Sequence, residues 1–128
     1  MAGMVLVDTS VWVRHFRETN ATLHGLLVQD RVLMHSLVRA ELACGTPPAP
    51  RASTLASLAM LRHCQEASVT ETLEFLETHQ LYGKGCGFVD LAILASTLIT
   101  PGAKLWTADA RLNTLAKMLR VDYAEPVH

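Results

Sequence analysis

Short apolar segments alternate along the chain with longer segments of helical periodicity. Met4–Val7 is an unbroken apolar run, and residues 31–34 and 104–107 are two further short segments centred on apolar side chains. Segments of this length, bounded by polar residues, are typical of strands that are buried on both faces. A fourth, brief strand is predicted at residues 67–69.

Three helices are predicted in the first half of the chain. The hydroxyl-rich turn after Asp8 is a typical helix start, and Thr22 is expected to cap a second helix that runs to about Gln29. Ser36–Cys44 predicts a third helix, which Gly45 ends because glycine is the usual residue just beyond a helix C-terminus.

The second half of the chain follows a loop, residues 46–50, whose three prolines exclude regular structure. Apolar stripes then predict two amphipathic helices, and a nearly continuous apolar segment predicts a buried helix over residues 88–98. Gly83, Gly85 and Gly87 mark an irregular turn before it, and a last stripe predicts a final helix. The three stripes consist of Leu55, Leu58, Ala59 and Leu61, of Val69, Leu73 and Leu76, and of Leu112, Leu115, Ala116 and Leu119.

Alternation of strands and helices predicts an α/β fold, a central parallel sheet with helices on both faces. With 128 residues, half of them hydrophobic, residues 1–128 are expected to form a single domain. A net charge of −1 provides no global attraction to nucleic acid. Because three scattered cysteines do not form a disulfide framework, and neither a signal peptide nor a bilayer-spanning segment is recognisable, we expect a cytoplasmic protein without membrane association.

Four of the 12 acidic side chains lie in apolar surroundings, where an uncompensated charge is costly. Asp8 and Asp109 follow the first and last predicted strands, at the strand ends where open parallel sheets form their sites. Glu41 and Asp90 share helical faces with apolar residues and are expected to point inward. If the four carboxylates converge, hard cations such as Mg²⁺ or Mn²⁺ would relieve their repulsion and could activate water against a phosphodiester.

Each of these acids also has a purely structural interpretation. Asp8 and Asp109 precede helices, and N-capping explains either of them equally well. Glu41 and Asp90 could form structural ion pairs with Arg39, Arg111 or another basic residue. The conjunction of all four favours a site.

Four sequence blocks resemble the successive motifs of PIN-domain ribonucleases, and most closely the VapC-like toxins of bacterial toxin–antitoxin pairs. The blocks are residues 5–12, 39–45, 87–96 and 105–112, and they occur in the family's order. The resemblance implies a PIN fold and a Mg²⁺- or Mn²⁺-dependent endoribonuclease whose products carry a 5′-phosphate and a 3′-hydroxyl. It also implies a homodimer and a cognate antitoxin protein that blocks the cleft.

The resemblance assigns roles to individual residues. The family's acidic cluster of catalytic residues and metal ligands falls on Asp8, Glu41, Asp90 and Asp109. We assign to Glu41 the additional role of orienting the attacking water. Supporting polar side chains fall on Ser10 and Thr107, and on Asn113, the nearest polar residue where some relatives have a further acid.

RNA contacts are expected from basic side chains near the cleft, which would bind phosphates. The candidates are Arg14, Arg17, Arg39, Lys84 and Arg111. For each of them singly, a solvated surface charge is the competing interpretation.

Two other functions remain open at this point. One is a different Mg²⁺-dependent α/β protein, such as a phosphatase or a phospho-acceptor receiver domain, although a haloacid-dehalogenase-type phosphatase would have Asp-x-Asp where this chain has Asp8, Thr9 and Ser10. The other is a catalytically silent PIN scaffold that only binds RNA or antitoxin. Zinc and serine chemistry are disfavoured, because the six histidines lack metal-binding spacing and Ser10 lacks a histidine partner.

Overall fold

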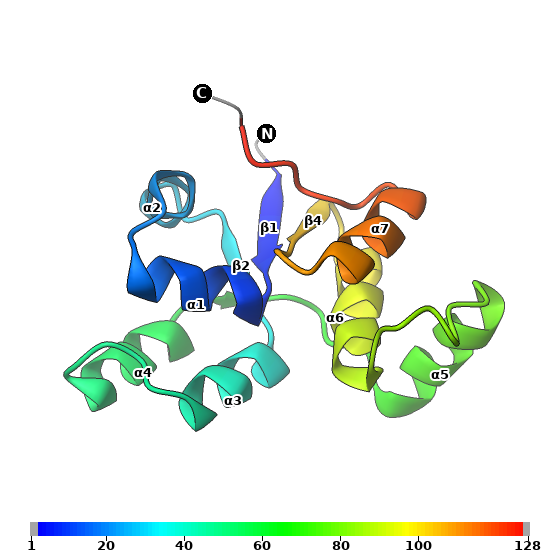
Figure 1. Ribbon diagram of the computed structural model, residues 1–128, viewed down its shortest axis with the longest axis horizontal. Helices are drawn as coiled ribbons and strands as arrows, with labels where there is room; N and C mark the ends of the chain where they lie inside the picture. Colours follow the sequence, from blue (N-terminus) through cyan, green and yellow to red (C-terminus); the bar gives the residue numbers. More distant parts are fainter. Residues whose placement is uncertain (1–2, 127–128) are drawn as a thin grey trace.

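The computed structural model describes residues 3–126, with a four-stranded parallel sheet in the order β3-β2-β1-β4 at its centre (Figure 1). The strands are β1 (Met4–Val7), β2 (Val32–Met34), β3 (Arg62–His63) and β4 (Ala103–Trp106). β1 pairs with both β2 and β4, and its residues Val5, Leu6 and Val7 are at most 1% exposed. The sheet therefore has its most apolar strand in its middle, as the unbroken apolar run predicts.

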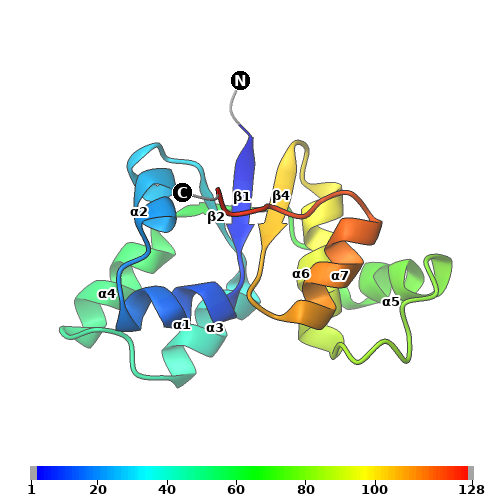
Figure 2. The same cartoon turned by 45° about the horizontal axis from the view of Figure 1, so that its top comes forward.

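Helices cover both faces of this sheet, which confirms the predicted α/β architecture. Figures 1 and 2 show α1, α2, α3 and α4 on one side, and α5, α6 and α7 on the other. The helices are α1 (Thr9–Arg17), α2 (Ala21–Val28), α3 (Ser36–Cys44), α4 (Arg51–Ala59), α5 (Val69–Thr78), α6 (Phe88–Ile99) and α7 (Ala110–Met118). Within residues 3–126 no helix is both long and apolar enough to cross a bilayer.

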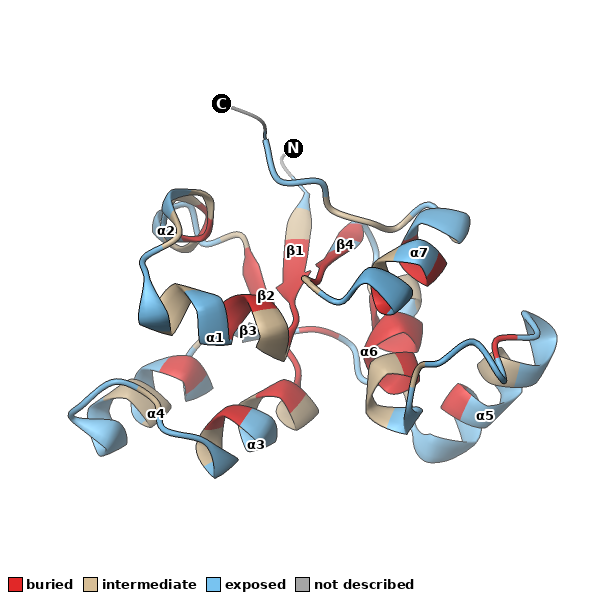
Figure 3. Ribbon diagram, in the orientation of Figure 1, coloured by how far each residue is buried: buried red, intermediate tan, exposed pale blue. Residues whose placement is uncertain are grey.

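α6 is the most deeply buried helix, as its continuous apolar sequence predicts (Figure 3). Every residue from 91 to 97 is buried, including two with hydroxyl groups. Ser96 donates to the carbonyl of Ala92 at 2.7 Å and Thr97 to that of Ile93 at 2.9 Å. These bonds satisfy the hydroxyls within the helix, so the buried side of α6 carries no unpaired hydroxyl.

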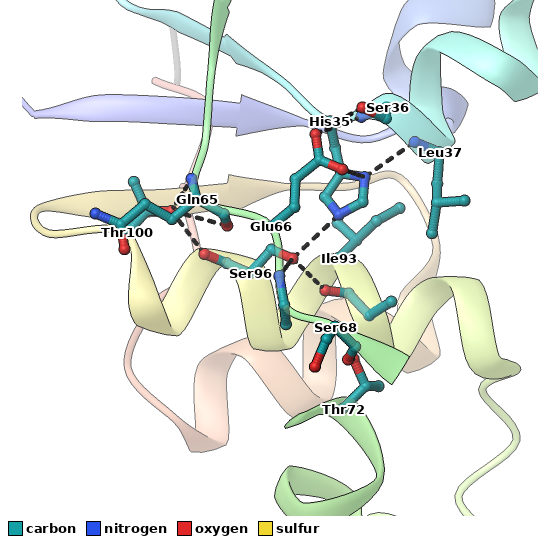
Figure 4. Close-up of polar contacts among 12 residues, drawn as sticks. His35, Ser36, Leu37, Gln65, Glu66, Ser68, Thr72, Ile93, Ser96 and Thr100 are labelled. Carbon is teal, nitrogen blue, oxygen red and sulfur yellow. Dashed lines mark hydrogen bonds and ion pairs between the residues drawn. The ribbon is translucent and has the colours of Figure 1, made fainter. Parts of the chain in front are cut away.

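A buried histidine ties β2, α3 and α6 together (Figure 4). The Nδ1 atom of His35 accepts the backbone N–H of Leu37 at 3.0 Å and thereby caps α3. Because Nδ1 accepts, the neutral ring carries its proton on Nε2, which donates to Ser96 Oγ on α6 at 3.0 Å. Burial lowers the pKa of His35, against the opposite effect of the Glu66 carboxylate. His35 thus fixes the start of α3 relative to α6.

The prediction of a strand at residues 67–69 is wrong. Residues 67 and 68 form a loop, Val69 is the first residue of α5, and the short fourth strand is β3 instead. The Ser68 side chain accepts the Glu71 N–H at 3.0 Å, and the Glu71 carboxylate accepts the Ser68 N–H at 2.9 Å. This reciprocal capping box starts a helix where a strand is predicted.

Two details of the helices also differ from the predictions. α2 is capped by Asn20, whose side chain accepts the Leu23 N–H at 2.9 Å, so Thr22 lies inside the helix. On α5 the predicted apolar stripe is largely solvated, with Val69 62% and Leu73 49% exposed. Thr72 is the buried residue of that helix, which packs on α6, and Phe75 and Leu76 pack partly against the core.

Candidate active site

Asp8 directly follows β1 and is only 6% exposed. It occupies the N-cap position of α1, yet its side chain caps nothing, so the capping interpretation is wrong for this residue. Its Oδ2 atom accepts hydrogen bonds from Ser10 Oγ at 2.7 Å and from Thr107 Oγ1 at 2.8 Å. Within residues 3–126 no protein donor bonds to Oδ1, which leaves this oxygen available to a ligand.

The two hydroxyls that hold Asp8 are themselves fixed by the turn between β4 and α7. Ser10 Oγ accepts the backbone N–H of Ala108 at 3.0 Å, and Thr107 Oγ1 accepts that of Asp109 at 3.0 Å. Each hydroxyl therefore accepts from the backbone and donates its single proton to the carboxylate. The structure thus brings Ser10 and Thr107 together with Asp8 in one network that spans β1 and β4.

Asp90 lies in the first turn of α6 and is half-buried. Its carboxylate accepts the Gly87 N–H at 3.4 Å. Burial raises the pKa of the Asp90 carboxyl, against the lowering effect of that N–H. The negative charges of Asp8, Asp109 and Glu41 raise this pKa further. The other three predicted acids therefore lie within electrostatic reach of Asp90, although the four come from distant parts of the chain.

Glu41 and Asp109 form the exposed side of this cluster. Glu41 is exposed on α3, which corrects the prediction that it points inward, and its Oε1 atom accepts the hydroxyl of Thr9 at 2.6 Å. The Asp109 carboxylate accepts the Leu112 N–H at 2.9 Å, so the N-cap interpretation is confirmed for Asp109. Its negative charge still acts on the Asp90 carboxyl.

Structural ion pairs do not account for these acids. Among the described residues, Arg62 forms an ion pair with Asp30, neutral His35 lies 3.9 Å from Glu66, and no ion pair involves Glu41 or Asp90. Carboxylates that gather at one site without forming ion pairs are the donor set that hard divalent cations prefer. In the described part of the chain, no three Asp, Glu, His or Cys side chains form a ready-made cage for a metal ion. The residues fit an ion that keeps several waters and contacts few carboxylates directly, as Mg²⁺ does.

A mostly apolar cavity of about 330 Å³ borders the cluster beside Glu41. Arg17 lies on its wall, so this predicted RNA contact is within reach of the site. Arg14 lies with Arg17 on a more open hollow, and Arg39 lines a separate groove between α3 and α4. The walls of the cavity are Val13, Phe16, Arg17, Glu41, Leu42, Gly45, Thr46, Pro47 and Pro48.

The loop before α6 reaches the other side of the cluster. Lys84 is exposed on it, and Asn113 is half-buried on α7. Burial raises the pKa of the Cys86 thiol in this loop, and the charges of Asp90 and Asp109 raise it further, whereas that of Arg111 lowers it. Arg111 is therefore the predicted basic residue that lies against this loop, two residues after Asp109.

Sequence reasoning missed two contributors to the site. Thr9 bonds to Glu41 and so joins α1 to α3, and its position between Asp8 and Ser10 in the first sequence block was the available signal. Gly87 supplies the backbone N–H that Asp90 accepts, which a sequence does not reveal because any residue has one.

Comparison with known proteins agrees with this arrangement. Residues 5–118 match the family described as PIN domain. Over 124 residues the chain is 40% identical to Ribonuclease VapC32 of Mycobacterium tuberculosis, in strain CDC 1551 / Oshkosh and equally in strain ATCC 25618 / H37Rv. These alignments cover 97% of this chain and 99% of the relative. With its parallel sheet, its acidic cluster and this similarity along nearly its whole length, the chain belongs to the PIN-domain family.

Proposed function

We propose that this chain is a metal-dependent endoribonuclease and the toxin of a toxin–antitoxin pair. The observation that carries the proposal is the acidic cluster, in which the buried Asp8 is held by two hydroxyls and Asp90 is repelled by three other carboxylates. The similarity to a protein named Ribonuclease VapC32 supports the activity. An RNA-cleaving toxin acts in the cytoplasm, where its substrate is.

Asp8, Asp90 and Asp109 are the residues that would hold Mg²⁺ or Mn²⁺, directly or through water, with Glu41 as a further ligand. A bound ion of this type activates water and stabilises the charge of the leaving oxygen. Ser10 and Thr107 fix the Asp8 carboxylate by bonding to Oδ2, and among the described residues they leave Oδ1 available to a ligand. Glu41, steadied by Thr9, is placed at the exposed side, where it can orient an incoming water.

Partners of two kinds belong to this proposal. The cavity beside Glu41 is where a cognate antitoxin segment would block the site, because its walls are mostly apolar and end at a catalytic carboxylate and at Arg17. We also propose a homodimer of chains that each form one PIN-like domain. The exposed Val69 and Leu73 on α5 are apolar side chains of the kind that an interface covers.

Incubation of the purified protein with single-stranded RNA and with tRNA tests the activity. We expect endonucleolytic fragments with 5′-phosphates in Mg²⁺ or Mn²⁺, and none after EDTA is added. Membership of the PIN-domain family argues against a phosphatase or receiver domain. Hydrolysis of a small phosphate ester while RNA stays intact would contradict our proposal and favour the phosphatase. RNA binding without cleavage in either metal would identify a silent scaffold.

A further inference from the structure

The side chain of Arg111 lies directly over a glycine of the loop that precedes α6. A Cβ atom placed on Gly85 would lie 2.8 Å from Arg111 Cδ, 3.1 Å from Nη1 and 3.2 Å from Nε. Carbon atoms do not approach one another this closely, so the arginine occupies space that any other residue at position 85 would fill. The backbone of Gly85, with φ +86°, is also one that glycine adopts without strain.

Arg111 stands at the end of α7 that does not favour a cation. It is the second residue of α7 after the Asp109 cap, near the positive end of the helix dipole. Within residues 3–126 its guanidinium makes no hydrogen bond and no ion pair, whereas Arg62 and Arg51 bond to protein oxygens. The guanidinium donors of Arg111 are therefore available to a ligand from outside.

The position of Arg111 relative to the acidic cluster follows from its neighbours on α7 and in the loop. Arg111 lies two residues after Asp109, and the loop that it covers at Gly85 continues to Gly87, whose N–H bonds to the Asp90 carboxylate at 3.4 Å. Arg111 therefore lies at the edge of the cluster, close enough to act there and yet unpaired with either carboxylate. An RNA strand approaching four carboxylates is repelled by them, and a cation at this edge offsets that repulsion.

We propose that Arg111 binds an RNA phosphate at the edge of the acidic cluster, and that Gly85 is a positioning residue that sets where the guanidinium lies. The planar guanidinium presents paired donors that match two phosphate oxygens. This inference rests on the proposed function, because a ribonuclease substrate provides the phosphate. It goes further by naming the residue that holds the substrate and the glycine that directs it.

The loop itself contains a matched control. Gly83 has φ +69°, and a Cβ atom there would meet nothing within 4 Å. Gly83→Ala therefore introduces the same kind of backbone strain as Gly85→Ala without touching Arg111. Any difference between the two variants reports the displacement of the arginine.

Steady-state RNA cleavage should be measured for the wild type, Arg111→Ala, Arg111→Lys, Gly83→Ala, Gly85→Ala and the double variant with alanine at positions 85 and 111. We expect Arg111→Ala to raise KM about tenfold, with a smaller change in kcat. A tenfold change is at the lower end of the range for losing one charge-assisted hydrogen bond. The slope of log(kcat/KM) against log salt concentration should become less negative by about 0.7, the value for one phosphate contact to a single strand. Arg111→Lys should restore the salt slope but only part of KM.

Gly85→Ala should raise KM several-fold more than Gly83→Ala, and should add nothing in the Arg111→Ala background. Equal KM values for the two glycine variants, or a full effect of Gly85→Ala without Arg111, would overturn the role of Gly85. An unchanged KM and salt slope in folded Arg111→Ala would overturn the whole inference, even if Gly85→Ala does not fold. If the wild type cleaves RNA but one of these contradicting outcomes is observed, the inference fails and the proposed function stands. If the wild type cleaves no RNA in either metal, the proposed function and the inference are both wrong.

Discussion

Thr107 donates a hydrogen bond of 2.8 Å to the buried carboxylate of Asp8, although the two residues are 99 positions apart in the sequence. The pairing of β1 with β4 explains this contact. Val7 and Trp106 are partners in the parallel register, so the residues that follow them leave the sheet side by side. The central strand pair thus positions the innermost acid of the site and one of its two hydroxyl donors.

Thr107→Val tests this contact with little change in side-chain shape. The variant removes one donor to Asp8 and the acceptor of the Asp109 N–H, so we expect it to cost about 1–3 kcal/mol in the free energy of unfolding. RNA cleavage should fall about tenfold in kcat/KM, as for partners that orient a metal ligand. Thr97→Val is the control, because that buried hydroxyl bonds only within its own helix. Equal activities of the two variants would contradict the role of Thr107.

Glu41→Gln should lower kcat about a hundredfold, because a neutral amide cannot accept a proton from the incoming water as a carboxylate can. The amide oxygen still accepts the Thr9 hydroxyl, so the contact between α1 and α3 survives and the melting temperature should hardly change. Glu74→Gln changes an equally exposed helical glutamate on α5 and should leave kcat at the wild-type value. Wild-type kcat in Glu41→Gln would exclude this residue from the chemistry.

Asp90→Asn should raise the melting temperature in EDTA. Burial and three neighbouring carboxylates raise the pKa of Asp90, so its charged form opposes folding at neutral pH, and a neutral amide removes that cost. Addition of Mn²⁺ should stabilise the wild type more than the variant, because the ion offsets the same repulsion. Thermal denaturation with and without the ion measures both effects. A variant less stable than the wild type in EDTA would contradict the repulsion.

His35 should make stability fall in weak acid. Burial lowers the pKa of His35 below 6.5, the Glu66 charge opposes this shift, and the His63 charge adds to it. The unfolded chain therefore takes up a proton first as pH falls. The stabilising contribution of neutral His35 is complete above pH 6.5 and is lost as pH falls towards the lowered value.

Urea denaturation across this pH range measures the effect. His35→Asn keeps an oxygen that can cap α3 but removes the titration, so its free energy of unfolding should depend less on pH below 6.5. His24→Asn, at an exposed position on α2, should keep the wild-type dependence. Parallel pH curves for the wild type and His35→Asn would refute the prediction.

Much of the framework could be predicted from the sequence because its signals are strong and local. The apolar run at Met4–Val7 and the apolar helix α6 have no other stable place than the core, and Ser36–Cys44 lies between residues that suit the ends of a helix. The strand at 67–69 was predicted wrongly because the Ser68–Glu71 capping box outweighs two apolar residues. The exposure of Leu73 depends on which face of α5 meets α6, which periodicity alone does not determine.

The candidate site could also be predicted only in part. The sequence indicates its four acids, because a carboxylate in apolar surroundings is costly unless a partner or a ligand compensates it. That Asp8 caps nothing whereas Asp109 caps α7 becomes visible only in the fold, which brings Thr107 to Asp8. The contact between Gly85 and Arg111 is equally invisible in a sequence, because it depends on how a loop and a helix meet.

Metal-dependent RNA cleavage by Asp8→Asn tests the central claim most directly. The amide oxygen can still accept the Ser10 and Thr107 hydroxyls, so the variant should fold, but it lacks the charge that would hold an ion. Asp30→Asn breaks only an exposed ion pair with Arg62 and serves as the control. We predict that EDTA-sensitive cleavage persists in Asp30→Asn and is lost in Asp8→Asn. Wild-type cleavage by folded Asp8→Asn would contradict the assignment of the acidic cluster as the active site.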